Sequence, residues 1–213
     1  MAKMPEGING HFIGKLGTVV GYYWKGIKVS RGLRKSARTK PFSPKELAQQ
    51  KKFGLMSSFL TGAGNLLNMT FAKDAIGKTG YSVGFSYNIK NAVAGEYPDL
   101  SINYASVKVG TGSLGAVEAP VATCVEKNTI QFTWINNGET ANVKATDRAY
   151  VAVYRPDTKI WYTRIDVAGR RDGICKIDLG NFGAPLVHTW IGFMLTNGKD
   201  ASDSSYTGVV ELI

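Results

Sequence analysis

The chain has 213 residues, carries a formal net charge of +10 at pH 7 and is 44% hydrophobic. A chain of this length can form one large domain, or a small domain with an extended segment, and its composition is that of a folded protein. Its opening residues contain no apolar leader region, and no apolar run reaches the roughly 18 residues of a membrane-spanning helix. We therefore expect neither a signal peptide nor a membrane span.

All of the excess positive charge lies in the first quarter of the chain. Residues 1–53 hold nine Lys and three Arg against Glu6 and Glu46, whereas residues 54–213 hold 14 basic and 14 acidic residues. Such an asymmetry favours an acidic or polyanionic partner for the N-terminal segment. The alternative is a solvated tail. The hydrophobic residues that lie among the basic ones in this segment argue against a solvated tail.

A β-hairpin is predicted near the N-terminus, where glycines recur through residues 7–33. Two β-prone runs, 18–24 and 27–30, are joined across Lys25 and Gly26, and this pair between such runs is a hairpin signal. The glycine spacing matches neither the dinucleotide-binding fingerprint nor a P-loop. These glycines are therefore expected to serve turns and close backbone packing.

A basic arm is predicted to follow the hairpin. Residues 34–42, with the sequence RKSARTKPF, show no periodicity, and Lys40 precedes Pro41, which favours extended backbone. Residues 1–42 are therefore assigned to a Gly-rich hairpin and a basic arm.

A helix is predicted to begin directly after the arm. Ser43 is a suitable N-cap, Pro44 suits the first helical position, and Glu46 completes a capping box. The helix should end near Gly62, and Gly54 should weaken its middle.

A second helix is predicted over about residues 82–94, with Gly95 as its C-terminal stop. Its apolar residues recur on one stripe. They are Phe85, Ile89, Ala92 and Val93. The two helices together define a helical segment over residues 43–98.

Beyond residue 98 the pattern changes to short β-prone runs separated by turn residues. The predicted strands are 102–109, 121–126, 129–135, 149–154, 160–166, 174–177, 187–195 and 208–212. Regular spacing of this kind is typical of an antiparallel sandwich. We predict a mainly β fold with a few helices, in which residues 99–213 form the β-sandwich domain and residues 118–213 its core.

The C-terminal part resembles a fibronectin type III or immunoglobulin-like sandwich. Trp134 lies in the run TIQFTW, where that fold often buries a tryptophan on its second strand. The run that starts at Tyr150 resembles the third strand, the run at His188 the sixth, and the run at Tyr206 the last. The resemblance implies binding or spacing and no chemistry.

The N-terminal half resembles a group of uncharacterised bacterial and phage-type proteins. Their pattern is a Gly-rich hairpin, then Trp-Lys-Gly, a basic stretch, and a Gln-rich helix that ends in a basic residue and Phe. Here it appears as a Gly-rich run from Gly14, as Trp24-Lys-Gly, as Arg31-Gly-Leu-Arg-Lys and as Gln49-Gln-Lys-Lys-Phe53. The later runs Tyr97-Pro-Asp and Ile102-Asn-Tyr-Ala-Ser-Val-Lys-Val also fit, so the resemblance covers most of the chain. It implies no established activity.

Candidate catalytic residues are few. Five aspartates could supply paired carboxylates for glycoside hydrolysis, although they lie mainly at predicted strand ends and turns, where Asp is common for backbone reasons. They are Asp147, Asp157, Asp166, Asp172 and Asp178. Three more could bind calcium but lack EF-hand spacing, namely Asp99, Asp200 and Asp203. No serine has a nucleophile-elbow context, so we predict that the chain is not an enzyme.

The cysteines and histidines point to no metal site and no cofactor. His11 and His188 lie far apart in sequence, and no zinc-ligand spacing is present. His188 lies in an apolar run and is expected to be a core or face residue. Cys124 and Cys175 could pair, but two buried thiols are the expectation for a chain without an export signal.

The candidate partner-binding site is a basic patch with interleaved aromatic residues. This mixture fits a groove on an acidic protein, with the aromatics as anchors, and it can also hold phosphates while rings stack on bases. The residues are Tyr22, Tyr23, Trp24, Lys25, Lys28, Arg31, Arg34, Lys35, Arg38 and Lys40. We favour the protein groove, because no recognised nucleic-acid module is visible.

These observations together predict a non-enzymatic structural protein of a large assembly of the bacteriophage virion kind. Its partners would be other protein subunits, including copies of itself, and it would lie in a virion or in the cytoplasm. One alternative is a nucleic-acid-binding protein that uses the same basic arm. A second alternative is a carbohydrate- or surface-binding sandwich protein.

Overall fold

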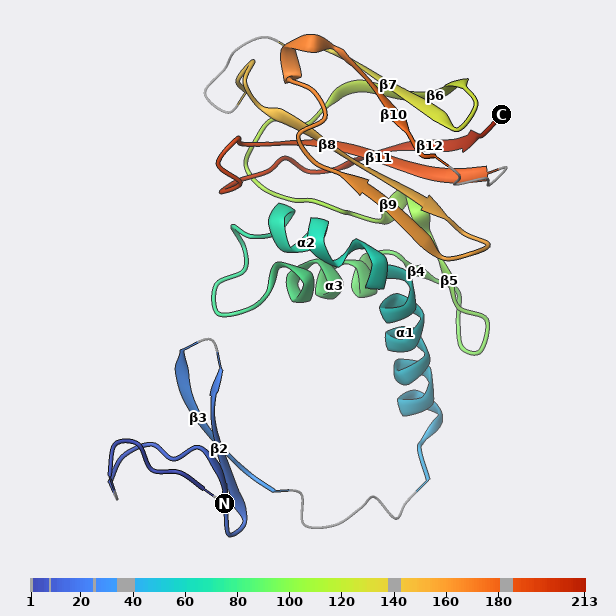
Figure 1. Ribbon diagram of the computed structural model, residues 1–213. Helices are drawn as coiled ribbons and strands as arrows, with labels where there is room; N and C mark the ends of the chain where they lie inside the picture. Colours follow the sequence, from blue (N-terminus) through green and yellow to red (C-terminus); the bar gives the residue numbers. More distant parts are fainter. Residues whose placement is uncertain (1, 8, 25, 34–40, 138–142, 181–185) are drawn as a thin grey trace. The chain divides into compact units, whose positions relative to one another are not determined.

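The computed structural model describes residues 2–7, 9–24, 26–33, 41–137, 143–180 and 186–213 (Figure 1). The chain divides into two compact units, Met1–Ser43 and Pro44–Ile213. Each unit is described separately.

The first unit is a three-stranded antiparallel sheet. Its strands β1 (Gly14–Leu16), β2 (Val19–Trp24) and β3 (Ile27–Gly32) pair in the order β1-β2-β3. Trp24 of β2 pairs with Ile27 of β3, so the predicted hairpin is confirmed. The predicted arm residues 34–40 lie outside the described part of the chain.

The second unit begins with helices. They are α1 (Pro44–Leu60), the 3₁₀ turn η1 (Thr61–Ala63), α2 (Gly64–Thr70) and α3 (Gly80–Asn91). The first predicted helix is confirmed, and α2 was not predicted. The second predicted helix corresponds to α3. It begins earlier than expected because Thr79 is its N-cap, and the Thr79 side chain accepts a hydrogen bond from the backbone N–H of Ser82. It also ends earlier, because Val93–Ala94 forms β4 and pairs with β5 (Ser101–Ile102).

The predicted strand 102–109 is wrong beyond its first residue. A 3₁₀ turn, η2 (Tyr104–Ser106), follows β5, and the Asn103 side chain accepts the backbone N–H of Ala105. Further along, buried Asn88 donates to the Lys108 carbonyl at 2.8 Å and accepts from the Lys108 N–H at 2.9 Å. Because an asparagine side chain satisfies these backbone groups, the segment needs no neighbouring strand.

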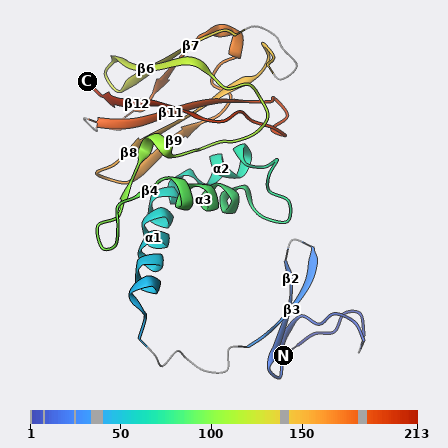
Figure 2. The ribbon, with the colours of Figure 1, turned by 180° about the vertical axis from the view of Figure 1, so that it is seen from behind.

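Seven strands then form a two-sheet sandwich (Figure 2). They are β6 (Glu118–Glu126), β7 (Thr129–Ile135), β8 (Arg148–Arg155), β9 (Ile160–Arg164), β10 (Ile174–Asp178), β11 (Leu186–Met194) and β12 (Ser205–Glu211). The sheets have the orders β10-β7-β6 and β12-β11-β8-β9, and every pairing is antiparallel. The mainly β fold class is confirmed.

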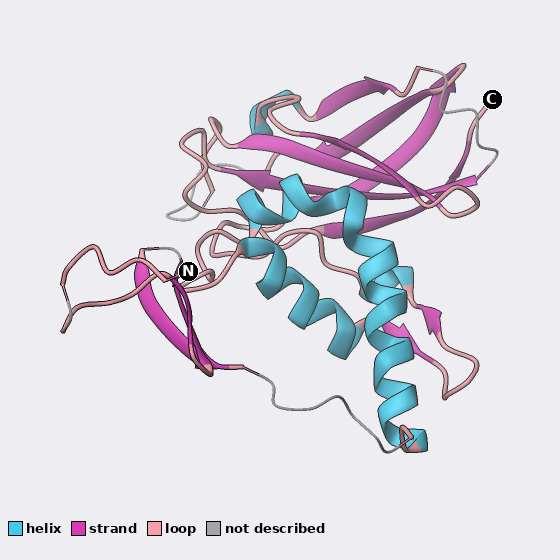
Figure 3. Ribbon diagram, turned by 60° about the horizontal axis from the view of Figure 1, so that its bottom comes forward, coloured by secondary structure: helices cyan, strands magenta, loops and turns pink. Residues whose placement is uncertain are grey.

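The second unit has three layers, because the helices cover the outer face of the four-stranded sheet (Figure 3). One core lies between the two sheets and another lies between this sheet and the helices. Strand β8 is buried on both faces, which explains its unbroken apolar run. Its inner residues are Ala149, Val151 and Val153, and its outer residues are Tyr150, Ala152 and Tyr154. Trp134 of β7 lies in the inter-sheet core, as predicted.

The two cysteines are free thiols, and Cys175 is buried as expected whereas Cys124 is only part-buried. Cys124 of β6 lies opposite Ile130 of β7, and Cys175 of β10 lies opposite Phe132 on the other side of β7. Two interstrand spacings, roughly 9–10 Å, therefore separate them, which is too far for a disulfide. Burial raises the pKa of the Cys175 thiol to about 11, so this thiol stays protonated at neutral pH.

Deleting residues 1–42 should leave the second unit folded, because Ser43 at the start of α1 is kept. The buried hydrophobic residues of the described chain all lie at or beyond Met56, so the deletion removes no core side chain. We expect a change in the free energy of unfolding of less than about 0.5 kcal/mol, measured by urea denaturation of both chains. Loss of the cooperative transition would contradict the division at Ser43.

Candidate functional site

The first unit has almost no core of its own. Among its described residues only Gly21 is buried, although the sheet carries several large apolar side chains. A small sheet gains stability by packing an apolar face against another surface. The two faces of this sheet therefore decide what the unit can bind.

One face is partly covered by the preceding N-terminal segment, although Leu16 and Tyr23 on this face remain 47% and 43% exposed. Lys28 Nζ lies 2.5 Å from Glu6 Oε2, and the Tyr23 hydroxyl donates to Glu6 Oε1 at 3.5 Å. The His11 ring meets the Tyr23 ring edge-on at 5.0 Å between centroids. The hydrogen bond from Lys28 lowers the pKa of the Glu6 carboxyl, and the same bond raises the pKa of Lys28. Both residues are thus occupied within the unit.

The cover lies directly on the backbone at Gly21. A Cβ atom placed there would lie 2.0 Å from the Phe12 carbonyl oxygen, so only glycine permits this approach. Lys3 and Ile13 exchange two backbone hydrogen bonds of 2.8 Å, which hold the covering segment closed on itself.

The opposite face carries exposed apolar side chains of the sheet. Directly paired residues share a face, and the pairs here are Trp24 with Ile27, Tyr22 with Val29, and Val20 with both Arg31 and Lys15. We call this set the apolar face: Lys15, Val20, Tyr22, Trp24, Ile27, Val29 and Arg31. Ile27 is 54% exposed and Trp24 is 44% exposed.

Positive charge lies at one end of the apolar face. The Arg31 guanidinium carbon lies 5.9 Å from the centroid of the Tyr22 ring, which is cation–π range. Lys15 occupies the same end, because both Lys15 and Arg31 pair with Val20. The arrangement can take an apolar partner surface that has acidic groups at one side.

The structure separates the residues of the predicted site. Tyr22, Trp24 and Arg31 lie on the apolar face, whereas Tyr23 and Lys28 lie on the covered face. The remaining members lie outside the described residues: Lys25, Arg34, Lys35, Arg38 and Lys40. Sequence reasoning missed Lys15, Val20, Ile27 and Val29. Their alternation with the residues of the other face is the signal that could have found them.

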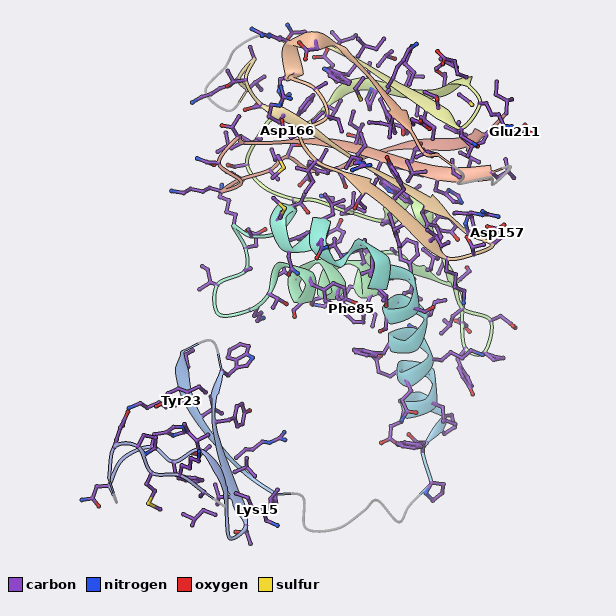
Figure 4. All side chains as sticks on the ribbon, viewed as in Figure 1. Lys15, Tyr23, Phe85, Asp157, Asp166 and Glu211 are labelled. Atoms are coloured by element: carbon purple, nitrogen blue, oxygen red, sulfur yellow. The ribbon has the colours of Figure 1, made fainter. Side chains whose placement is uncertain are left out.

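The candidate carboxylates are not brought together as a catalytic pair. Figure 4 shows Asp157 and Asp166 at opposite ends of one sheet, where they bind Arg155 and Arg148 respectively. Asp172 accepts the Gly169 N–H and Asp178 accepts the Gly180 N–H, both at 2.7 Å. Asp147 forms a buried ion pair with Arg170. Each carboxylate therefore has a structural partner.

Two of the three calcium candidates, Asp200 and Asp203, have side-chain partners within the unit. Asp200 binds Lys73 at 2.7 Å and Ser113 at 2.6 Å, and Asp203 binds Lys108 and Thr111. Over the described residues no group of three or more His, Cys, Asp or Glu side chains could hold a metal ion.

His188 is a part-buried member of an aromatic cluster. Its ring stacks on Tyr104 at 3.7 Å between centroids, and its Nδ1 shares a 2.7 Å hydrogen bond with the Tyr206 hydroxyl. Burial lowers the pKa of His188, so its ring is neutral at pH 7. The prediction of a core or face histidine is consistent with this environment.

The family of the chain follows from a sequence comparison. Residues 11–208 match the profile described as "Family of unknown function (DUF6266)", and the chain belongs to that family. A search of curated proteins found no match. None of the helices in the described ranges has the length and apolar content needed to cross a membrane.

Proposed function

We propose that the chain is a non-enzymatic structural protein of a large assembly, of the phage-virion kind, and that the first unit is its docking module. The observation that carries the proposal is a three-stranded sheet with one partly covered face, almost no buried residue, and an apolar face that includes Ile27 at 54% exposure. Burying this face on another subunit would supply the core that the sheet lacks.

The composition of the apolar face favours a protein partner. Val20, Ile27 and Val29 are aliphatic side chains, which pack well in a protein interface but do not stack on nucleotide bases. Arg31 and Lys15 at one end favour acidic groups on the partner. The excess positive charge of residues 1–53 acts in the same direction.

The second candidate, nucleic-acid binding, is favoured by one observation. Arg31 lies over the half-buried Tyr22 ring, and a cation next to an aromatic ring is a combination that single-stranded nucleic acids bind. Such binding would weaken steeply with salt, in proportion to the phosphates contacted. A titration with single-stranded DNA at two salt concentrations tests this alternative.

Replacing Tyr22, Ile27 and Val29 together by Ser should abolish assembly without changing the melting transition of the second unit. The three changes remove apolar area from the docking surface and leave every core residue beyond Met56 in place. The measurement is the fraction of the chain that sediments with large particles in a density gradient, from cells that naturally make the protein. We expect a decrease of about tenfold or more, equivalent to about 1.4 kcal/mol of binding free energy.

A matched control is available on the outer face of the three-stranded sandwich sheet. Val121, Ile135 and Ile174 are 51%, 54% and 44% exposed, so their joint replacement by Ser removes a similar apolar area elsewhere. The control should sediment like the wild type. A wild-type chain that stays monomeric, both purified and in the gradient, would overturn the proposal.

A further inference from the structure

A groove in the second unit lies between α1 and the four-stranded sheet. Its volume is about 370 Å³, which is within the range of small-molecule sites. It is lined by Lys51, Gly54, Leu55, Ser58, Phe59, Ile102, Tyr154 and Lys159. Lys51, Gly54, Leu55 and Ser58 are spaced i, i+3, i+4 and i+7, so they form one face of the helix.

A glycine keeps the helical wall of this groove open. Gly54 lies inside α1, where glycine costs helix stability relative to alanine. A Cβ atom added at Gly54 would meet no atom within 4 Å. Helix packing therefore does not require glycine at this position, and a side chain much larger than alanine would extend into the open space of the groove.

The floor of the groove holds a polar group without a partner. Tyr154 is only 3% exposed, and no hydrogen bond joins its hydroxyl to another residue of the described ranges. Phe59 packs edge-on against its ring at 4.8 Å between centroids. Burial, and secondarily Tyr104, raises the pKa of Tyr154 to about 12, so the hydroxyl remains a donor at neutral pH. The hydroxyl therefore reaches the groove with its donor free for a ligand that supplies an acceptor.

Two cations flank this donor. Lys51 and Lys159 both line the groove, and neither forms an ion pair with a carboxylate within the described part of the chain. Lys159 has a φ of +56°, a left-handed conformation that favours Gly or Asn over a long side chain. Lys159 is the last residue of the β8–β9 turn, and a left-handed residue there is the ordinary geometry of a hairpin loop, which places this side chain at the groove.

We infer that this groove binds a small amphipathic anion, with its apolar part on Leu55, Phe59 and Ile102 and its anionic group between Lys51, Lys159 and the Tyr154 hydroxyl. The carboxylate or sulfonate oxygens accept the hydrogen bond that Tyr154 offers, and the two lysines neutralise the charge. The inference concerns the second unit alone and does not depend on the docking module.

The full chain can be tested with 8-anilinonaphthalene-1-sulfonate, a fluorescent aromatic sulfonate. Gly54→Leu fills the groove and should lower the affinity roughly tenfold or more, while its melting temperature stays equal to or above that of the wild type. Lys51→Glu combined with Lys159→Glu should lower the affinity by a similar factor. Tyr154→Phe removes the hydrogen-bond donor alone and should lower it several-fold.

Two controls separate the groove from other apolar surfaces of the chain. Lys127→Glu combined with Lys199→Glu makes the same charge change at exposed positions elsewhere and should leave the affinity unchanged. The uncharged N-phenyl-1-naphthylamine should lose binding in Gly54→Leu but keep it in the Lys51→Glu and Lys159→Glu variant. Wild-type affinity for the sulfonate in both the Gly54 and the lysine variants would overturn the inference, whatever the outcome of the assembly experiment.

Discussion

Replacing Asp147 by Ala should lower the free energy of unfolding by about 3–5 kcal/mol, because the change leaves a buried guanidinium without its charge partner. Arg170 is fully buried and Asp147 is 1% exposed, and the Arg170 Nε lies 3.2 Å from Asp147 Oδ2. Desolvation lowers the pKa of Arg170, but an arginine remains charged at neutral pH. The variant must therefore bury an uncompensated cation or open its structure to water.

The other contacts of Arg170 hold the guanidinium where it is. It donates to the Gly115 carbonyl at 2.7 Å, and its central carbon lies 3.9 Å from the centroid of the Phe193 ring. These contacts prevent the side chain from swinging to the surface when Asp147 is removed. Removing Asp147 therefore leaves the Arg170 guanidinium without a charge partner in the interior of the sandwich.

Urea denaturation followed by circular dichroism gives the measurement, and an exposed ion pair gives the control. Asp157 binds Arg155 at 2.7 Å, yet its side chain is 56% exposed, so Asp157→Ala should cost at most about 1 kcal/mol. A cost below about 1 kcal/mol for Asp147→Ala as well would show that water reaches Arg170 in the variant.

The strands of the sandwich could be predicted because each is a short β-prone run between turn residues. Thr129–Ile135 was predicted to the residue, since its buried and part-buried positions alternate over one sheet face. Strand β8 reads as a continuous apolar run because helices cover its second face. In both cases the local pattern and the tertiary environment agree.

The errors arose where side chains replace backbone pairing. The segment 102–109 has β-prone residues, but Asn88, far back in the chain, satisfies its backbone groups at Lys108. Helix α2 was missed because Gly64 opens it, and its Ala63 N-cap makes no side-chain capping hydrogen bond. Local propensity shows neither a distant side chain that replaces strand pairing nor a helix that begins without a capping residue.

The candidate sites could be predicted only in part. Aromatic and basic residues of the N-terminal hairpin stand out in the sequence, but the assignment of Tyr22 and Tyr23 to opposite faces depends on strand register. The groove was not predicted, because it brings Gly54 of α1 near Lys159 of the β8–β9 turn, about a hundred positions along the chain. The sequence identifies Gly54 as a residue that lowers the stability of its helix, and the structure places this residue in the wall of the groove.

Replacing Trp134 by Ala should cost about 3–5 kcal/mol of unfolding free energy, by creating a cavity between the two sheets. Trp134 is 6% exposed and meets the Phe193 ring edge-on at 5.6 Å between centroids. Its indole Nε1 donates to the Arg170 carbonyl at 2.8 Å, so the change also leaves that oxygen without its donor.

Trp134→Phe separates these two contributions. It keeps most of the ring volume and loses the hydrogen bond, so it should cost about 1–3 kcal/mol, the penalty of a buried carbonyl left unsatisfied. Because Trp134 and Asp147 both contact Arg170, the cost of removing both should differ from the sum of the single costs by about 0.5 kcal/mol or more. Urea denaturation of the single and double variants measures the unfolding cost of each single change, the cost of the double change, and the difference between that cost and the sum of the single costs. A cost near zero for Trp134→Ala would place this side chain at the surface and would contradict the register of β7 against β10 and β6.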